Sequence, residues 1–493
     1  MVLLHTIVNY QYLLLIATCV AFANGENQEV LNGNGVMLEP VLLANDSDII
    51  HLSNDYDIAI PQLLTPWSNT DDMLMTSSLG QLFVSELLTE EEIVPDFRRL
   101  TNQQRVYKTL FQKFGPMLAT GVNFQETDEK LWNLFQSLEK TLYPWIHTSF
   151  KSSFDIAKST NGAGIVFCVG DNHYAHAVSS IRALREVLNS QIPIEIFYID
   201  EGDLSPANRQ YFETKFTNVK TVDISQILDP KWTKLGGWAI KPFAMLASSF
   251  TEVILIDADV YFLRKPEDLF SDPAYLKTGT LFFYDRTILP NWTKGRDWLL
   301  SFLPSYSTQI SRSRWWSLTS SHEQESGVVV INKSKSLLGL LSSCKMNAKK
   351  ERDEVTYKHV HGDKETFWVG YEMTQTPYAF MKSYGAALGG LAREGDTKRV
   401  CGNQLHVGTD GRPFWWNGGL ARDKNRHAEE YTEYTHFATG NNWEFTTNCI
   451  QETDHVYQTT PEEQHIVERF IQIDKVRKEE ELMAKNGSVV NPK

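Results

Sequence analysis

The sequence predicts an α/β fold, built on a central, mostly parallel sheet and preceded by an N-terminal helical region. Two patterns support this class. From residue 164 onward, short apolar runs alternate with amphipathic stretches of about ten to fifteen residues, which is typical of parallel strands joined by crossover helices. Between residues 77 and 142, apolar residues recur at mixed spacings of three and four positions, which favours helices.

Each expected element has its own local pattern. The strands are short apolar runs bounded by turn residues, and the helices carry one apolar stripe. Helices are expected at 77–92, 102–114, 126–142, 174–188, 206–216, 238–250 and 461–484. Strands are expected at 164–170, 194–199, 219–222, 252–256, 280–284 and 327–332. The last helix is rich in charge, and we interpret it as a solvated helix that packs by one face.

Composition divides the 493 residues into five regions. They are an apolar leader, an acidic and Asn-rich stem or loosely ordered arm, a helical subdomain, the main α/β domain, and a C-terminal helix with a tail. Their expected ranges are 1–24, 25–75, 76–158, 159–450 and 451–493.

The leader admits two interpretations. Its apolar run, Tyr12 to Ala23, spans about a dozen residues, which fits the core of a cleaved signal peptide better than a membrane span. Ala21-Phe22-Ala23 also has the small-x-small pattern of a cleavage site. If the stretch is counted from Met1, it approaches the ~20 residues of a span, so an uncleaved membrane anchor stays open. Both interpretations place the chain in the secretory pathway.

Charge and cysteine spacing argue against two classes of protein. The formal net charge of −14 argues against a nucleic-acid binder, which would normally carry a basic stripe. No closely spaced cysteine pair or Cys/His cluster occurs, so a structural zinc site is not expected. After the leader, four cysteines allow three disulfide pairings, and the sequence does not choose among them. These are Cys168, Cys344, Cys401 and Cys449.

Two carboxylates follow the expected strand at 252–256. Asp257 and Asp259 stand one residue apart, at the carboxyl end where open α/β sheets bind ligands. Carboxylate oxygens hold hard cations such as Mg²⁺ or Mn²⁺. A cation with few protein ligands keeps positions open for diphosphate oxygens and offsets the charge on a leaving nucleoside diphosphate. The pair alone is a weak signal in an acidic protein, and its place after a buried strand strengthens it.

A Gly-, Arg- and Trp-rich segment far downstream supplies further candidates. His406 would add an imidazole to the same metal. Gly408 and Gly411 would let backbone N–H groups approach a phosphate, and Arg412 would pair with it. The alternative for His406 is a hydrogen-bonded structural residue, and the composition of its surroundings favours the ligand.

Three more charged residues are candidates for the reaction itself. Asp363 precedes an aromatic helix start, where it either binds acceptor hydroxyls near the reacting carbon or caps the helix. Glu325 stands before the strand at 327–332, either as a second catalytic carboxylate or in a plain loop. Lys241 lies on the helix that leads to the carboxylate pair and would contact the donor diphosphate, unless it is a surface lysine.

Together these segments resemble the fungal alpha-1,3-mannosyltransferases of glycosyltransferase family 71, over residues 164–420. The landmarks are GIVFCVGDNHYAHAVSSIRALRE, GWAIKPFAMLASSFTEVILIDADVYFLRKPEDLF, YLKTGTLFFYDR, ESGVVVINKSK, GDKETFW and QLHVGTDGRPFWWNGGL. The last is also similar to the His-x-x-Gly-x-x-Lys-Pro-Trp pattern of glycogenin-like retaining transferases, with Arg412 in place of the Lys and Phe414 before the Trp.

The resemblance implies a GT-A-type nucleotide-sugar-binding domain. It further implies GDP-mannose as the donor, Mn²⁺ held by Asp257, Asp259 and His406, and retention of configuration at the sugar carbon. It also implies a type II Golgi membrane enzyme that extends mannosylated glycoproteins or oligosaccharides, or a secreted enzyme if the leader is cleaved.

Two alternatives stay open beside this resemblance. The first is a transferase of the same fold that uses UDP-glucose or UDP-galactose. The second is a non-catalytic carbohydrate-binding glycoprotein of the secretory pathway. The intact carboxylate pair and His406 argue against the second.

Overall fold

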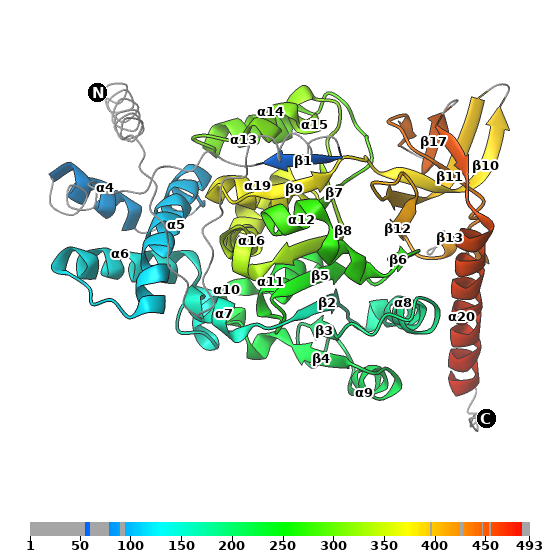
Figure 1. Cartoon of the computed structure of the whole chain (residues 1–493), viewed down its shortest axis with the longest axis horizontal. Helices are drawn as coiled ribbons and strands as arrows, with labels where there is room; N and C mark the ends of the chain where they lie inside the picture. The colour runs from blue at the N-terminus through cyan, green and yellow to red at the C-terminus, as the bar shows by residue number, and fades with distance from the viewer. Residues whose placement is uncertain are drawn as a thin grey trace.

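The computed structural model describes residues 55–59, 78–88, 94–394, 397–423, 427–445, 447–452 and 455–485. At its centre lies an eight-stranded sheet in the order β1-β9-β7-β8-β5-β2-β3-β4 (Figure 1). Four of its seven neighbouring strand pairs are parallel, and three are antiparallel. The predicted α/β class with a central, mostly parallel sheet is therefore confirmed.

The central strands are apolar on both faces. In β5 (Glu252–Ile256), Val253 and Leu255 join one hydrophobic cluster, and Ile254 and Ile256 join another, because successive side chains of a strand alternate between faces. The other strands of the sheet are β1 (Tyr56–Ala59), β2 (Ala163–Cys168), β3 (Ile194–Tyr198), β4 (Val219–Asp223), β7 (Thr280–Tyr284), β8 (Gln324–Asn332) and β9 (Tyr378–Met381).

Helices cover both faces of this sheet. One cluster packs the sheet against α11 (Ile240–Ala247), α16 (Lys333–Asn347) and α19 (Lys364–Thr374). The other packs it against α8 (Tyr174–Arg182), α9 (Pro206–Lys215) and α12 (Pro273–Thr278). A sheet buried on both sides explains why its strands read as continuous apolar runs in the sequence.

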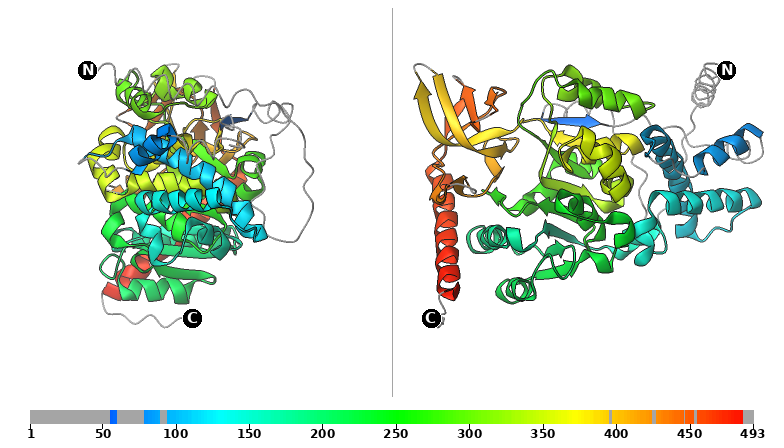
Figure 2. Two further views of the ribbon diagram at one scale, coloured as in Figure 1. Left: turned by 90° about the vertical axis from the view of Figure 1, so that its left-hand side faces the viewer. Right: turned by 180° about the vertical axis from the view of Figure 1, so that it is seen from behind.

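The predicted N-terminal helical region is also confirmed. It consists of α4 (Ser78–Leu88), α5 (Phe97–Thr120), α6 (Glu126–Leu142) and α7 (Ser153–Ser159). Helix α5 starts earlier than expected because Asp96 caps it, with its Oδ1 accepting the backbone N–H of Arg98 at 2.8 Å. The region lies at the opposite end of the molecule from the C-terminal helix (Figures 1 and 2).

The range 25–75, predicted to be a stem, contributes strand β1 to the edge of the central sheet. Tyr56 pairs with Met381 of β9, and its hydroxyl donates to Asp272 Oδ2 at 2.6 Å. Four residues are too short to show a strand period, so the pattern gave no sign of this element. The rest of the stem and the leader lie outside the described residues. Among the helices that the structure describes, none has the length and apolar character needed to cross a membrane.

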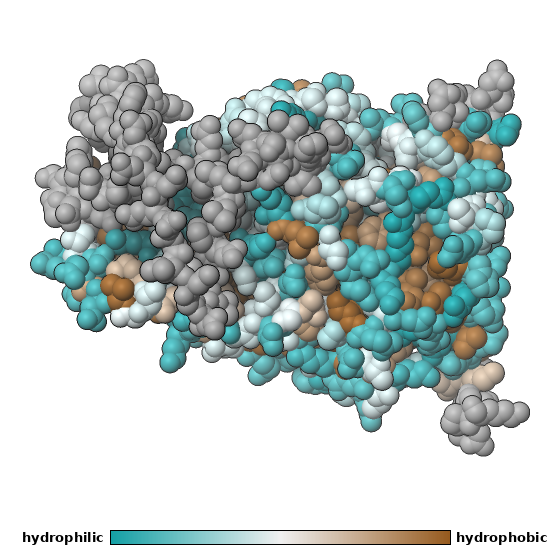
Figure 3. Space-filling model, in the orientation of Figure 1, coloured by the Kyte–Doolittle hydropathy of each residue, from teal (hydrophilic) through white to brown (hydrophobic). Residues whose placement is uncertain are grey.

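A second sheet, which the sequence patterns did not predict, is formed by the C-terminal part of the chain. It is antiparallel, and it includes β6, which follows β5 of the central sheet along the chain and in which Phe262 pairs with Trp415 of β12. On the face in Figure 3, hydrophobic residues gather mainly over this part of the molecule. Its strands are β10 (Ala386–Glu394), β11 (Thr397–Val407), β12 (Pro413–Asn417), β15 (His436–Ala438), β16 (Trp443–Glu444), β17 (Cys449–Glu452) and β18 (Val456–Gln458), with β6 (Tyr261–Phe262) at its junction.

The C-terminal helix predicted at 461–484 is α20 (Pro461–Lys485). Its residues Val467 and Phe470 are buried against Trp416 and Tyr434 of the second-sheet region. The helix therefore packs by one face, as its charge pattern indicated. Figure 2 shows α20 running along the side of the molecule beyond the second sheet.

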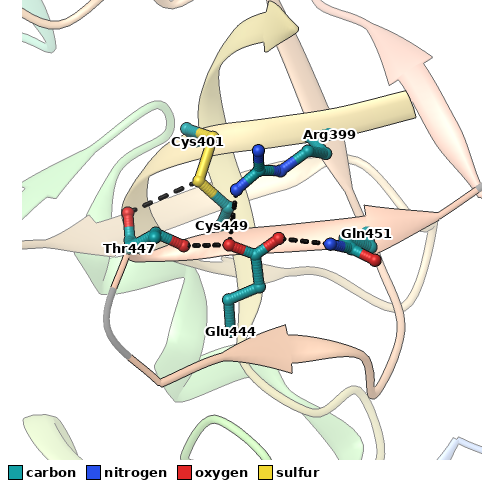
Figure 4. The surroundings of a disulfide bond; sticks show 6 residues. All are labelled: Arg399, Cys401, Glu444, Thr447, Cys449 and Gln451. Carbon is teal, nitrogen blue, oxygen red and sulfur yellow. Dashed lines mark hydrogen bonds and ion pairs between the residues drawn. A yellow bond between two sulfur atoms is a disulfide. The ribbon is translucent and has the colours of Figure 1, made fainter. Parts of the chain in front are cut away.

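One disulfide bond ties the second sheet together. Cys401 of β11 lies directly opposite Cys449 of β17 and is bonded to it. An ion pair between Arg399 and Glu444, at 2.5 Å, lies beside the bond (Figure 4). Cys168 and Cys344 are free.

We predict that removing this disulfide loosens the second sheet. The bond closes a loop of 48 residues, so the double variant C401S/C449S should lower the free energy of unfolding by about 2–4 kcal/mol. Urea unfolding of the oxidised chain measures this loss. The variant C344S, which removes a free buried thiol instead, is the control for a Cys→Ser change. Equal stability of C401S/C449S and the wild type would contradict the pairing.

Candidate active site

Three strands present acidic residues at one edge of the central sheet. Because β8 is antiparallel to β5, the start of β8 lies beside the end of β5. On its other side β8 is antiparallel to β7, with Phe283 opposite Glu325. Asp257 after β5, Glu325 in β8 and Asp285 after β7 therefore converge on this edge. With Asp363, which stands at the start of α19, they form what we call the carboxylate cluster.

Lys241 is the buried cation of this cluster. Its Nζ lies 2.7 Å from Asp257 Oδ1 and 3.8 Å from Asp363 Oδ1, and it donates to the backbone oxygen of Ser326 at 3.3 Å. Burial would lower the pKa of Lys241, but Asp257 and Asp363 raise it above its ordinary value. The alternative prediction from the sequence, that Lys241 is a surface lysine, is wrong, since only 6% of Lys241 is exposed.

Asp257 and Asp259 lie at the end of β5, as predicted. About a quarter of the Asp257 side chain is exposed, with a relative area of 25%. Desolvation raises the pKa of Asp257 to about 7, although Lys241 opposes the shift. The backbone oxygen of Asp259 accepts the N–H of Gly419 at 2.8 Å. This bond ties the carboxylate pair to the end of β12 in the second sheet.

Asp363 and Glu325 are both buried in the cluster. Asp363 makes no side-chain capping bond to α19, and its Oδ2 is buried without a hydrogen-bond partner within the described part of the chain. The helix-cap interpretation of Asp363 is therefore not supported. Glu325 lies in a strand and not in a loop, and its Oε1 accepts from the Asn417 amide and the Gly327 N–H, each at 2.8 Å. Burial raises the pKa of both carboxyls.

Three residues of the site were not among the sequence candidates. Asp285 Oδ2 lies 2.5 Å from Lys364 Nζ and 3.1 Å from His322 Nδ1, and Lys364 also contacts His322. Burial would raise the pKa of Asp285, but Lys364 and His322 hold it well below its usual range. The available signal was positional: Asp285 follows a buried strand in the same way as Asp257.

His406 lies between the two sheets. It stands opposite Trp415 in the β11–β12 pair, with ring centroids 4.0 Å apart, and its ring also contacts Phe283 at 5.4 Å. Neither ring nitrogen has a hydrogen-bond partner within the described residues. Burial lowers the pKa of His406 to about 3, so the imidazole is neutral. A neutral, unpartnered nitrogen is what a metal ligand requires.

The predicted metal ligands are not gathered into one coordination sphere. Across the described ranges, no three His, Cys, Asp or Glu side chains are grouped so that they could hold a metal ion. Asp257 and Asp259 share the strand end, whereas His406 lies in the packed junction with Trp415. The metal-binding role of these three residues stays a prediction.

The structure does not bring Gly408, Gly411 and Arg412 to the carboxylate cluster. They form the turn between β11 and β12, at the opposite end of β12 from Asn417. The N–H of Gly411 donates to Gly408 O at 2.9 Å, and the N–H of Gly408 donates to Arg412 O at 2.9 Å. The Arg412 guanidinium pairs with Glu463 of α20, with Nε 3.1 Å from Oε1. Their phosphate-binding role also stays a prediction.

Comparison with known proteins bears on the same part of the chain. The model of a family described as "Mannosyltransferase putative" matches residues 162–407. The alpha-1,3-mannosyltransferase MNN1 of Saccharomyces cerevisiae is 24% identical over 390 residues, which cover 67% of this chain and 50% of that protein. The alpha-1,3-mannosyltransferase MNT3 of the same yeast is 25% identical over 311 residues, covering 55% and 48%. This chain thus spans half or less of the length of these two relatives.

Among solved structures, the mannosyltransferase Ktr4p from S. cerevisiae in complex with GDP is similar over 62% of this chain and 81% of that chain. The sequence identity is 12% and the TM-score is 0.28.

Proposed function

Because the chain belongs to the mannosyltransferase family whose model matches residues 162–407, we propose that it is a metal-dependent retaining glycosyltransferase. It moves mannose from GDP-mannose to a mannose-containing glycan, and the relatives named for alpha-1,3 transfer make that linkage the one to test first. The observation that carries the proposal is the carboxylate pair Asp257 and Asp259 at the end of a buried strand, beside a buried cation.

Asp257 and Asp259 would hold Mn²⁺, with His406 as the third ligand. Two features of these residues fit the ion: the carboxylates are partly exposed, and both nitrogens of the buried His406 lack a partner within the described residues. When bound, the metal offsets the negative charge that grows on the departing diphosphate. For His406 to join the two carboxylates as a ligand, the junction between the two sheets, where His406 packs on Trp415, would have to rearrange.

Lys241 positions the carboxylates before the donor binds. Its ammonium lies between Asp257 and Asp363, which would otherwise repel each other. The same charge favours a diphosphate at the open side of Asp257. Further phosphate contacts are proposed for Gly408, Gly411 and Arg412. To reach a phosphate, the Arg412 guanidinium would first have to break its contact with Glu463.

Asp363 is the proposed partner of the acceptor hydroxyl. Its Oδ2 is buried and lacks a donor within the described residues, and an unpaired buried carboxylate oxygen is costly until a hydroxyl donates to it. Glu325 is held by Asn417 and Gly327 at the adjoining position. We propose that Glu325 acts as the second carboxylate near the reacting carbon.

The disulfide supports a place in the secretory pathway. Bonds such as Cys401–Cys449 persist in oxidising compartments. We propose that the enzyme acts in the Golgi lumen on mannosylated glycoproteins or oligosaccharides. The leader would serve as a type II anchor, and the enzyme would be secreted if the leader is cleaved.

A donor panel tests this proposal. Purified full-length chain is incubated with Mn²⁺, α-mannobiose and either GDP-mannose, UDP-glucose or UDP-galactose, and release of the nucleoside diphosphate is measured. We expect turnover with GDP-mannose to exceed turnover with the UDP-sugars at least about a hundredfold, since the base and sugar contacts together supply several kcal/mol. Preference for a UDP-sugar would contradict the donor. Mannobiose binding without release of either diphosphate would contradict the enzyme itself.

A further inference from the structure

An exposed tryptophan stands beside the carboxylate cluster. Trp238 belongs to the short 3-10 turn η5 (Gly237–Ala239), which leads into α11 three residues before Lys241. Trp238 is 51% exposed, whereas Lys241 is 6% exposed. The chain therefore passes from a solvent-facing indole to the buried cation of the site within one helical turn.

The indole is seated on the residues that start α19. A Cβ atom at Gly362 would lie 2.9 Å from Trp238 Cε3, so the ring rests directly on the backbone before Asp363. Gly362 has a φ of 70°, which glycine adopts without strain. The ring of His361 has its centroid 5.1 Å from that of Trp238. These contacts hold the indole beside the residues that precede Asp363.

A line of rings continues inward from the indole. His361 lies 6.0 Å from His322, with the two rings 19° from parallel. His322 in turn contacts Asp285 through its Nδ1 at 3.1 Å. The rim of the site is thus aromatic, and the interior is charged.

Exposure alone does not distinguish Trp238. Trp232, in α10 (Pro230–Thr233), is 45% exposed, and its ring lies under its neighbour Lys231 at 4.9 Å. What sets Trp238 apart is its contact with the residues around Asp363. Asp363 itself is 2% exposed, and its Oδ2 has no hydrogen-bond partner within the described residues. The exposed indole therefore packs on the residue that directly precedes this buried acceptor.

This pairing matches the two sides of a sugar ring. A hexopyranose has an apolar face of C–H groups, which packs on an aromatic ring, and a polar edge of hydroxyls, which donate to a carboxylate. We infer that Trp238 is the stacking platform of the acceptor subsite, on which the terminal hexose of the acceptor lies with one hydroxyl directed to Asp363. The inference rests on the proposed function, because the sugar that it places is the acceptor of that transfer.

Steady-state kinetics of W238A test the platform. Loss of the ring should raise the KM for α-mannobiose about tenfold, while the KM for GDP-mannose stays within about twofold of wild type. W238F keeps an aromatic face and should restore most of the acceptor affinity. W232A, which removes another exposed tryptophan, is the matched control and should leave the KM for α-mannobiose unchanged. An unchanged acceptor KM in folded W238A, or an equal rise in W232A, overturns the inference.

A binding measurement separates this inference from the proposed function. Titration of the full chain with α-mannobiose should change its tryptophan fluorescence, and the change should be kept in W232F and lost in W238F. If the wild type fails to turn over any nucleotide-sugar, the proposed function fails, but loss of the signal in W238F still supports a sugar platform. Persistence of the full signal in W238F shows that the sugar binds elsewhere and contradicts the platform.

Discussion

Asp259→Asn is expected to lower kcat/KM for transfer from GDP-mannose by about a thousandfold, because a metal ligand contributes several kcal/mol of charge stabilisation to the transition state. The side chain is partly exposed at the end of β5, so the folded chain should tolerate the change. Asp257→Asn should have a similar effect on transfer. It also removes the closest carboxylate from Lys241, so its effect mixes catalysis with stability, and Asp259→Asn is the cleaner variant.

Glu252→Gln is the matched control for this loss. Glu252 lies at the other end of the same strand, where its Oε1 accepts the hydroxyl of Tyr275 at 2.8 Å. The amide keeps an acceptor there, so transfer should stay within about twofold of wild type. Thermal unfolding reports whether each variant is folded, and Mn²⁺ binding measured by calorimetry reports the ligand role. A folded Asp259→Asn variant that binds Mn²⁺ and transfers normally would refute the metal site.

Lys241→Met is expected to damage both stability and transfer. Removing the cation leaves Asp257 and Asp363 without the charge that now contacts both of them. Breaking a buried pair in this way should lower the free energy of unfolding by about 3 kcal/mol. The pKa of Asp257 is already raised to about 7, and it will rise further, so less of the carboxylate is ionised and able to bind metal at pH 7. We expect kcat/KM to fall by at least about a hundredfold.

Lys333→Met separates loss of a buried lysine from loss of the site. Lys333 is fully buried and donates to Ser248 O at 2.6 Å and Leu246 O at 3.3 Å, at the far end of α11. Its removal should lower stability while kcat/KM per folded molecule stays within about twofold of wild type. Urea unfolding and donor turnover, measured on both variants, distinguish the two cases. If both variants lose the same fraction of kcat/KM, Lys241 has no specific role at the site.

The middle strands of the central sheet were predictable because they are apolar on both faces, whereas β1 and β9 were not predicted. Strand β5 spans Glu252–Ile256 as expected, since its apolar run ends abruptly at Asp257. The second sheet lacks such runs: in its β10–β11 pair, Gly389 lies opposite Gly402. The two backbones approach each other too closely for a side chain at either position. Because glycine has no side chain, both positions interrupt the apolar pattern of these strands. Strands whose apolar pattern is interrupted in this way are fixed by tertiary pairing and not by local pattern.

The site was only partly predictable for a related reason. Asp257 carries a local signal, a carboxylate directly after a buried strand. His322 does not, because its contact with Asp285 depends on the antiparallel return from β7 to β8. Arg412 is a different case: its motif predicts a phosphate contact, which stays a prediction, and the structure places Glu463 of α20 against its guanidinium. The local sequence of a segment does not show which distant helix packs against it.

The metal dependence of donor turnover is the most direct test of whether Asp257 and Asp259 hold a catalytic metal. Full-length chain is stripped of divalent metal with a chelator, and GDP release from GDP-mannose is measured before and after Mn²⁺ is restored. We expect turnover to fall to background in the stripped wild type and to return when Mn²⁺ is restored, but not to return in Asp259→Asn. Undiminished turnover in the stripped chain, or equal recovery in the wild type and Asp259→Asn, would contradict the metal site.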